Sequence, residues 1–547
     1  MRQRHLFSVL LGCGLLLSSA AFARDTPPAL PGWSLFRVQL GSAITKPESG
    51  RLLLFAISAK DAEAAAKQHG GDGKIDAVDT SPFFPTQTAV AARELSRLVP
   101  GQTVDMDADE IAFPRAWSQL PAGDYYVQAV LDVHHDYNYD GRDAGDLLSP
   151  VVKIHLPAAT IPDLRLDSVI PARDPWQLGE HASPDMRAAL PAARAHERDI
   201  DFTSPVLSAF WGRPIHMHGR VLLPPGYDAN AKATYPTVYY TQGFGGNNDR
   251  VIGRLVSVYA AMAKGQMPPM IWVFLDESSP TGTTEFADSV NNGPWGTALT
   301  TELIPRLERS YRMDARPNGR FLQGHSSGGW ATLWLQTRYP KLFGGTWSTS
   351  PDPSDFHDFT GVDLYAPHAN VYRKADGEPY PLVRDQGKVL ATFQQFAQLE
   401  RVMGPYGGQM ASFEWVFSPK GKDGRPEPMF DRDTGDVDPA VVDYWRDHYD
   451  IAWRLQHHWA ELEPDLNGKI HLYVGTADTF YLDGAAHKLK AVLDGLHAKS
   501  DIRFLPGRTH FDLYQIGEDR QGLLKAITWQ MYQVARPHSA LKPRSQA

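Results

Sequence analysis

A G-x-S-x-G turn between an extended and a helical segment is the feature that most constrains the fold of this chain. Residues 324–328 carry the motif, with Ser326 at its centre. Residues 320–323 before it are typical of a short strand, and tryptophan and leucine recur at helical spacing over residues 330–335. Glycine tolerates the dihedral angles and close contacts that such a turn requires. The pattern predicts a nucleophile elbow, in which Ser326 stands on a strained strand-to-helix turn.

Length and composition narrow the class of protein. A chain of 547 residues is too long for one ordinary core, so we expect two or three domains. Hydrophobic residues make up 42% and charged residues 21%, which is typical of a folded globular protein. The formal net charge is −9 and there is no long basic run, which argues against nucleic acid or an anionic membrane as a partner.

The first 23 residues have the pattern of a signal peptide. Arg2 and Arg4 precede an apolar run over residues 6–17, and an A-x-A site ends at Ala23. The run is too short for a stable membrane span. The only cysteine, Cys13, lies inside it, so the mature chain would contain no disulfide. Lipid attachment at Cys13 is a less favoured alternative, because the apolar run continues beyond it. We expect a periplasmic or secreted bacterial protein.

Residues 24–157 are rich in strand and turn patterns and predict an antiparallel β-sandwich domain. Residues 158–198 are rich in Pro, Ala and Arg and indicate a linker with one helical stretch. The strands expected in the first domain are 33–40, 51–56, 125–130 and 151–156.

From residue 199 to residue 547, strand and helix patterns alternate. This alternation predicts an α/β fold with a doubly wound, mostly parallel sheet. The expected strands are 235–240, 270–275, 320–323, 469–474 and 502–505, with helices over 297–311 and 485–497 among those between them.

Residues 352–463 interrupt this alternation. A structureless loop of that length is uncommon in a domain. Helical patterns near 389–403 and over 441–459 flank a polar stretch, 418–439. We therefore expect a folded insertion beside the active-site face.

The partners of an activated serine follow in the order acid, then histidine. Asp478 stands one short loop beyond the expected strand 469–474, and His510 follows the last expected strand. Both positions lie at the carboxyl edge of the sheet, where open α/β sheets place their sites. We predict Ser326, Asp478 and His510 as the catalytic residues. The N–H groups of Phe244, in a glycine-rich loop, and of Ser327 are the expected oxyanion donors.

Two of these residues also have structural interpretations. Asp478 could cap the helix that follows it, and His510 could be a solvated loop histidine. Asp483 is a second carboxylate near the same strand, but its position before a helix favours an N-cap.

The first domain carries a possible calcium loop. Residues 136–141 match D-x-N-x-D-G, with Asp136, Asn138 and Asp140 as weak ligand candidates. The twelfth position of such a loop is Leu147, which cannot coordinate a cation. The alternative is an acidic turn between two strands, and no metal or other cofactor is required by the expected chemistry.

From about residue 202 to 532 the chain resembles the esterase family of the α/β-hydrolase superfamily, which includes feruloyl and acetyl-xylan esterases, S-formylglutathione hydrolase and the enterochelin-esterase type. The resemblance implies an α/β-hydrolase fold with Ser326 as nucleophile, Asp478 as acid and His510 as base. Two departures are Gln242-Gly243, where the family often has His-Gly, and the long interval between Ser326 and Asp478. The matching pieces are residues 220–227, 243–246, 324–329, 339–343, 475–478 and 509–512.

Together these features predict an exported serine esterase that acts on a small-molecule or polysaccharide-linked ester through a Ser-His-Asp triad and an acyl-enzyme. Two alternatives remain open at this point. A serine peptidase of the prolyl-oligopeptidase type also combines this triad with an appended β-domain. A surface binding protein could keep a degenerate hydrolase fold without activity.

Overall fold

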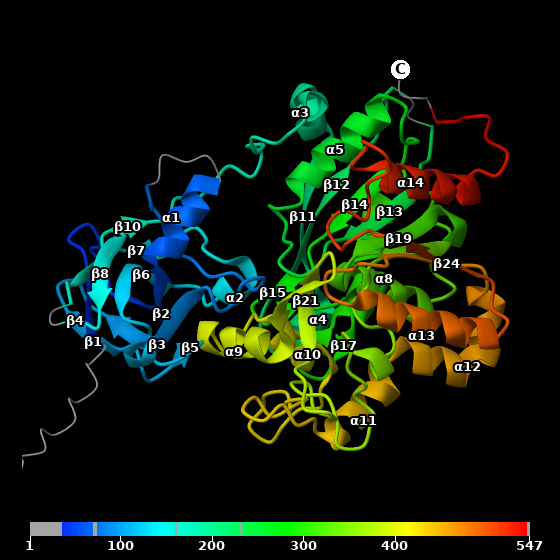
Figure 1. The fold of residues 1–547 in the computed structure, drawn as a ribbon. Coiled ribbons are helices and arrows are strands. Elements are labelled where there is room, and N and C mark those ends of the chain that lie inside the picture. Colours follow the sequence, from blue (N-terminus) through cyan, green and yellow to red (C-terminus); the bar gives the residue numbers. More distant parts are fainter. Residues whose placement is uncertain (1–34, 69–73, 159–160, 230–231, 544–547) are drawn as a thin grey trace, which may run out of the picture.

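A computed structural model of the chain describes residues 35–543 except 69–73, 159–160 and 230–231. The predicted signal peptide lies outside the described residues. Figure 1 shows a strand-rich N-terminal unit, in blue and cyan, beside a larger unit of strands and helices coloured from green to red. In the part of the chain that the structure describes, no helix is long and apolar enough to span a membrane.

An eight-stranded sheet forms the centre of the larger unit. Its strand order is β11-β12-β14-β13-β19-β20-β23-β24, and the six strands from β14 to β24 are parallel. At one side of the sheet, β12 pairs antiparallel with both β14 and the edge strand β11. The five predicted strands are confirmed to within a few residues at each end. The strands are β11 (Glu197–Thr203), β12 (His216–Leu222), β13 (Thr237–Thr241), β14 (Ile271–Leu275), β19 (Arg320–His325), β20 (Gly345–Thr349), β23 (Ile470–Gly475) and β24 (Ser500–Leu505).

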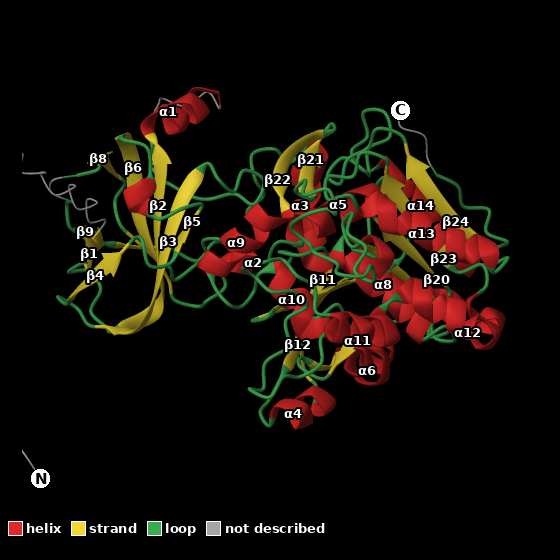
Figure 2. Cartoon of the chain, turned by 60° about the horizontal axis from the view of Figure 1, so that its bottom comes forward, coloured by secondary structure: helices red, strands yellow, loops and turns green. Residues whose placement is uncertain are grey.

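Helices cover both faces of this sheet. Successive side chains of a strand point to opposite faces, so neighbouring residues of one strand pack against different helices. In β13, Val238 and Tyr240 pack in a cluster with the helices α5 and α14, whereas Tyr239 belongs to a cluster with α6 and α7. Figure 2 labels α5, α6 and α14 of these helices beside the strands. The helices named are α5 (Ile252–Ala263), α6 (Trp295–Ala298), α7 (Ile304–Ser310) and α14 (Gly522–Ala535).

The N-terminal unit consists of two sheets that share a hydrophobic core. Phe36 and Val38 of the three-stranded sheet pack with Leu52 and Leu54 of the seven-stranded sheet. All pairs in these sheets are antiparallel except β1 with β9. The first sheet has the order β4-β1-β9 and the second β10-β7-β6-β2-β3-β5, with β8 also on β6. The strands are β1 (Leu35–Leu40), β2 (Glu48–Ser58), β3 (Thr88–Leu98), β4 (Thr103–Asp107), β5 (Ala112–Phe113), β6 (Gly123–Asp132), β7 (Leu147–Leu148), β8 (Val152–Leu156), β9 (Leu164–Leu166) and β10 (Ser168–Val169).

Three details differ from the sequence prediction. β9 and β10 lie inside the predicted linker and complete the N-terminal sheets, so only the part around helix α3 (Pro184–His196) connects the units. The helix expected over 389–403 begins later, as α9 (Phe393–Met403), because Thr392 forms a capping box and the residues before it belong to strand β22 (Lys388–Thr392). The helix expected over 441–459 is two helices, α11 (Pro439–Tyr449) and α12 (Ile451–Leu466), because Asp450 caps the second one.

The helix α9 of the insertion packs on the outer face of the seven-stranded sheet of the N-terminal unit. Leu399 and Met403 of α9 pack with Leu53 and Phe55 of β2 in one cluster. The buried guanidinium of Arg51 donates hydrogen bonds of 3.0 and 2.7 Å to the carbonyl of Val402. Figure 1 shows α9, in yellow, beside β3 and β5. The alternate residues of β2 therefore serve two cores, one within the N-terminal unit and one shared with the insertion.

Candidate active site

Ser326 occupies a strained turn between β19 and α8 (Ser327–Arg338). Its φ is 60° and its ψ −125°, a conformation that non-glycine residues rarely adopt. The flanking glycines make the turn possible. A Cβ on Gly328 would lie 2.1 Å from the carbonyl oxygen of Gln242, and one on Gly324 would lie 2.0 Å from that of Gly328. The structure thus has the elbow geometry that the motif predicts.

Asp478 and His510 form a buried pair. Nδ1 of His510 lies 3.0 Å from Oδ2 of Asp478, and both side chains are almost fully buried. Oδ1 of Asp478 accepts a 2.9 Å hydrogen bond from the backbone N–H of Phe480. Asp478 therefore accepts a hydrogen bond within the following turn and contacts His510 at the same time. It is not the N-cap of the helix that follows, which is Tyr481, and its role as the catalytic acid stays a prediction. Burial alone would raise the pKa of Asp478, but the charge and hydrogen bond of His510 outweigh it, and the pKa is lowered overall.

A second histidine stands beside this pair. The ring centroids of His325 and His510 are 4.4 Å apart. Burial, and after it the charge of His510, holds the pKa of His325 well below its usual value. His325 is therefore neutral at neutral pH and adds no competing positive charge next to His510.

The predicted oxyanion loop lies directly against the serine. A Cβ on Gly243 would be only 2.7 Å from the Cβ of Ser326, so only glycine fits there. The N–H of Gly246 donates a 2.9 Å hydrogen bond to the carbonyl of Gly243 and closes a tight turn around Phe244. Ser327 is the first residue of α8, and the first N–H groups of a helix have no partner within the helix. The structure brings both predicted donors to the elbow.

Asp352 is a residue near the elbow that the motifs did not identify. Its carboxylate accepts a 2.6 Å hydrogen bond from Oγ of Ser327, and its N–H donates to the carbonyl of Ser326 at 3.2 Å. Burial raises the pKa of Asp352 to about 6, against the opposing effect of the hydrogen bond from Ser327. Asp352 holds the first turn of α8. The signal available in the sequence was a carboxylate shortly after a buried strand, β20.

The elbow and the histidine open into one cavity of about 600 Å³. Its wall comes from three parts of the chain: the larger unit, the insertion and the N-terminal unit. The lining is largely apolar and aromatic. It includes Pro82, Phe83 and Tyr139 of the N-terminal unit, Phe396, Leu399 and Met403 of α9, and Gly243, Phe244, Ser326, Phe480, His510 and Phe511.

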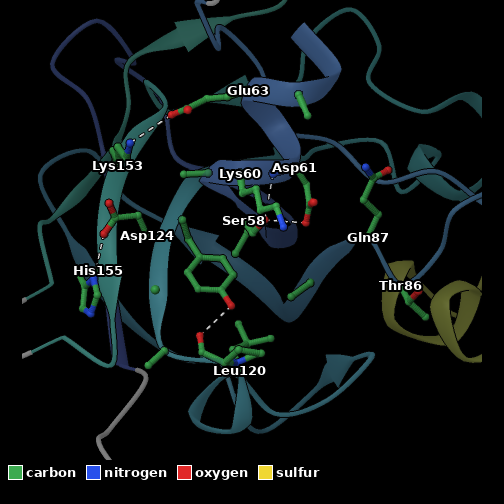
Figure 3. Close-up of a pocket in the computed structure, with 18 of the residues that line it drawn as sticks. Ser58, Lys60, Asp61, Glu63, Thr86, Gln87, Leu120, Asp124, Lys153 and His155 are labelled. Atoms are coloured by element: carbon green, nitrogen blue, oxygen red, sulfur yellow. Dashed lines mark hydrogen bonds and ion pairs between the residues drawn. The ribbon is translucent and has the colours of Figure 1, made fainter. Parts of the chain in front are cut away.

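A second cavity, of about 1050 Å³, lies within the N-terminal unit between α1 (Ala59–Gln68), β6 and β8 (Figure 3). Two ion pairs line it. Nζ of Lys153 lies 3.2 Å from Glu63, and Nδ1 of His155 lies 2.8 Å from Asp124. None of the predicted catalytic residues lines this cavity.

The possible calcium ligands lie close to the catalytic cavity. Carboxylate oxygens of Asp136, Asp140 and Asp143 lie within 4.8 Å of one another. The amide of Asn138 instead donates a 2.9 Å hydrogen bond to the carbonyl of Glu400 in α9. Calcium binding at this loop stays a prediction.

Comparisons with known proteins identify the family of this chain. Residues 213–514, more than half of the chain, match the family described as "Putative esterase", and the chain belongs to that family. The resemblance to esterases expected from the sequence is thereby confirmed.

One curated relative and two solved structures illustrate the similarity. The iron(III) enterobactin esterase of Dickeya dadantii (strain 3937) is 28% identical over 131 residues, which are 23% of this chain and 30% of that protein. The chain thus spans less than a third of the length of this relative. A ferulic acid esterase structure is 15% identical with a TM-score of 0.37, covering 62% of this chain and 97% of its own. The S-formylglutathione hydrolase of Agrobacterium tumefaciens is 12% identical with a TM-score of 0.35, covering 62% and 94%.

Because Asp478 and Asp483 make different contacts, we predict that replacing each of them by Asn has a different effect on kcat. Asp478→Asn should lower kcat for a p-nitrophenyl ester by about 10⁴, because an amide favours the wrong imidazole tautomer of His510. Asp483 forms an ion pair with Arg384 at 2.8 Å instead. Asp483→Asn should therefore change kcat by less than about tenfold, since it removes no contact with His510. Steady-state kinetics of the two purified variants would test this, and a reversed order would reassign the acid to Asp483.

Proposed function

We propose that this protein is an exported serine esterase that hydrolyses carboxylic esters with Ser326 as nucleophile. The observation that carries the proposal is a strained serine that shares one cavity with a histidine fixed by a buried aspartate. A proton on Nδ1 of His510, held by Asp478, leaves Nε2 free to act as a base. The family, which is one of esterases, supports ester hydrolysis as the reaction.

The reaction has two steps. Nε2 of His510 takes the proton of Ser326 as Oγ attacks the ester carbonyl, and the N–H groups of Phe244 and Ser327 bind the developing oxyanion. The imidazolium returns the proton to the leaving alcohol, which leaves an acyl group on Ser326. His510 then takes a proton from a water molecule as its oxygen attacks the acyl carbonyl. The bond from Oγ of Ser326 to the acyl group breaks, the imidazolium returns the proton to Oγ, and the carboxylic acid leaves.

The cavity wall suits an ester with an apolar acyl or alcohol group. The rings of Phe83, Phe480 and Phe511 lie with their centroids 5.7 to 6.1 Å apart near His510. Similar proteins are named for ferulic acid esters, S-formylglutathione and iron(III) enterobactin. A panel of feruloyl and acetyl xylans, S-formylglutathione and a catecholate siderophore would establish which ester this protein prefers.

Replacing the nucleophile tests the mechanism. We expect Ser326→Ala to lower kcat for p-nitrophenyl acetate by about 10³ to 10⁶. The thermal midpoint should change little, because the Oγ of Ser326 serves catalysis and the glycine contacts hold the turn. Ser327→Ala is the control. It removes the hydrogen bond to Asp352 and should lower the midpoint, but it keeps the backbone N–H and therefore most of kcat.

Three results would contradict this account. Wild-type turnover by Ser326→Ala would show that another residue is the nucleophile. Cleavage of peptide anilides in preference to every ester would favour the serine peptidase, and no turnover of any ester or anilide by the wild type would favour a binding protein.

We also propose that the protein is exported, on the basis of the basic and apolar pattern of residues 1–23. N-terminal sequencing of the protein recovered from the periplasm or medium should begin at Arg24. A product that keeps Met1 and stays in the cytoplasm would contradict export.

A further inference from the structure

The short helix α2 (Tyr137–Asp140) of the N-terminal unit touches the oxyanion loop of the larger unit. The hydroxyl of Tyr139 donates a 2.6 Å hydrogen bond to the carbonyl of Gly246. The ring of Tyr139 lies 4.9 Å from that of Phe244, with the planes at 80°. Tyr139 is only 7% exposed, and burial raises its pKa well above the usual value, so its hydroxyl stays a donor.

Two further contacts join the same segments. The amide of Asn247 donates a 3.1 Å hydrogen bond to Oδ1 of Asp140. The guanidinium of Arg250 donates to the backbone carbonyl of Asp140 and, at 2.7 Å, to that of Gly245. Two consecutive carbonyls of the loop, those of Gly245 and Gly246, are thus held by side chains that contact or belong to α2.

The loop needs such support because glycine has more backbone freedom than other residues. Three of the four residues from Gly243 to Gly246 are glycines, and Gly245 has a φ of +80°. One end of the turn is fixed by its close approach to Ser326. The outer end faces α2, and the N–H of Phe244 lies between the two ends. A donor stabilises an oxyanion best when it is already oriented before the reaction.

The helix α2 is itself held in place by the rest of the N-terminal unit and by the insertion. The hydroxyl of Tyr137 donates to Asp79, and the amide of Asn138 donates to the carbonyls of Glu400 and Gly404 at 2.9 and 3.0 Å. These hydrogen bonds fix the position of α2 beside the oxyanion loop.

We propose that Tyr139 is a positioning residue for catalysis, through which the N-terminal unit orients the oxyanion donor at Phe244. The proposal rests on the proposed esterase function. It assigns the N-terminal unit a part in the chemical step, in addition to lining the cavity.

The test compares two tyrosine-to-phenylalanine variants. Tyr125 is also 7% exposed, belongs to the same unit and donates a 2.9 Å hydrogen bond to a backbone carbonyl, that of Pro121, but it does not line the catalytic cavity. Each variant loses one hydroxyl and its hydrogen bond to a carbonyl. The thermal midpoint of each is measured first, and the kinetics follow at a temperature below both midpoints.

For Tyr139→Phe we expect kcat and kcat/KM for p-nitrophenyl acetate to fall together by about tenfold with KM unchanged. An equal fall is typical of an interaction made only in the transition state. The loss should be smaller than the 10² to 10³ that follows removal of an oxyanion donor outright. Binding of phenylboronic acid, whose adduct on a serine carries a tetrahedral oxyanion, should weaken by a similar factor. Tyr125→Phe should keep both values within about twofold.

Other outcomes would overturn the proposal. Unchanged kcat and boronic acid affinity in Tyr139→Phe would show that the hydroxyl does not orient the donor. Equal losses in both variants would show a general effect of destabilisation. If the wild type hydrolyses the ester and Ser326→Ala does not, either result removes only the role of Tyr139 and leaves the esterase function standing.

Discussion

The close packing of three backbone segments around Ser326 is the constraint on which the site depends. The end of β19, the start of α8 and the loop after β13 approach one another so closely that a side chain on Gly243 or Gly328 would overlap a neighbouring atom. This packing holds Ser326 at a positive φ, a conformation that costs on the order of 1–3 kcal/mol and persists only when surrounding structure over-determines it. The same contacts bring the serine, the oxyanion loop and the first N–H groups of α8 to one point. The buried pair of Asp478 and His510 then reaches that point from the last two strands.

Two segments far from the elbow in sequence complete the site. The helix α9 covers one face of the N-terminal sheet with Leu399 and Met403, and the same residues line the catalytic cavity. The helix α2 contacts α9 through Asn138 and the oxyanion loop through Tyr139. A change in the docking of the N-terminal unit would therefore reach the cavity wall and the proposed oxyanion donor together. We therefore infer that the N-terminal unit forms part of the catalytic site.

The sequence was sufficient for those parts of the site that have a local pattern. Ser326 and Asp478 each follow a short buried strand, and His510 follows the half-buried edge strand β24. Strand ends and turn residues can be recognised within a few positions. The parts of the site that the sequence did not predict depend on contacts between residues far apart in the chain. The role of Asp352 follows from its contact with Ser327, and the contact of Tyr139 with Gly246 spans more than a hundred residues without any periodic signal. The start of α9 was placed too early because Val389 and Leu390 suit a helix or a strand equally, and the cap at Thr392 decides between them.

Covalent labelling with a fluorophosphonate probe, followed by mass mapping, tests the central claim most directly. Such probes phosphonylate a serine only where a base activates it. Tryptic digestion would release residues 321–338 as one peptide, because Arg320 and Arg338 bound it. The account predicts one adduct per chain, on Ser326 within that peptide and not on its neighbour Ser327, with slower labelling in Asp478→Asn. An adduct on a different serine, or an unlabelled protein, would contradict it.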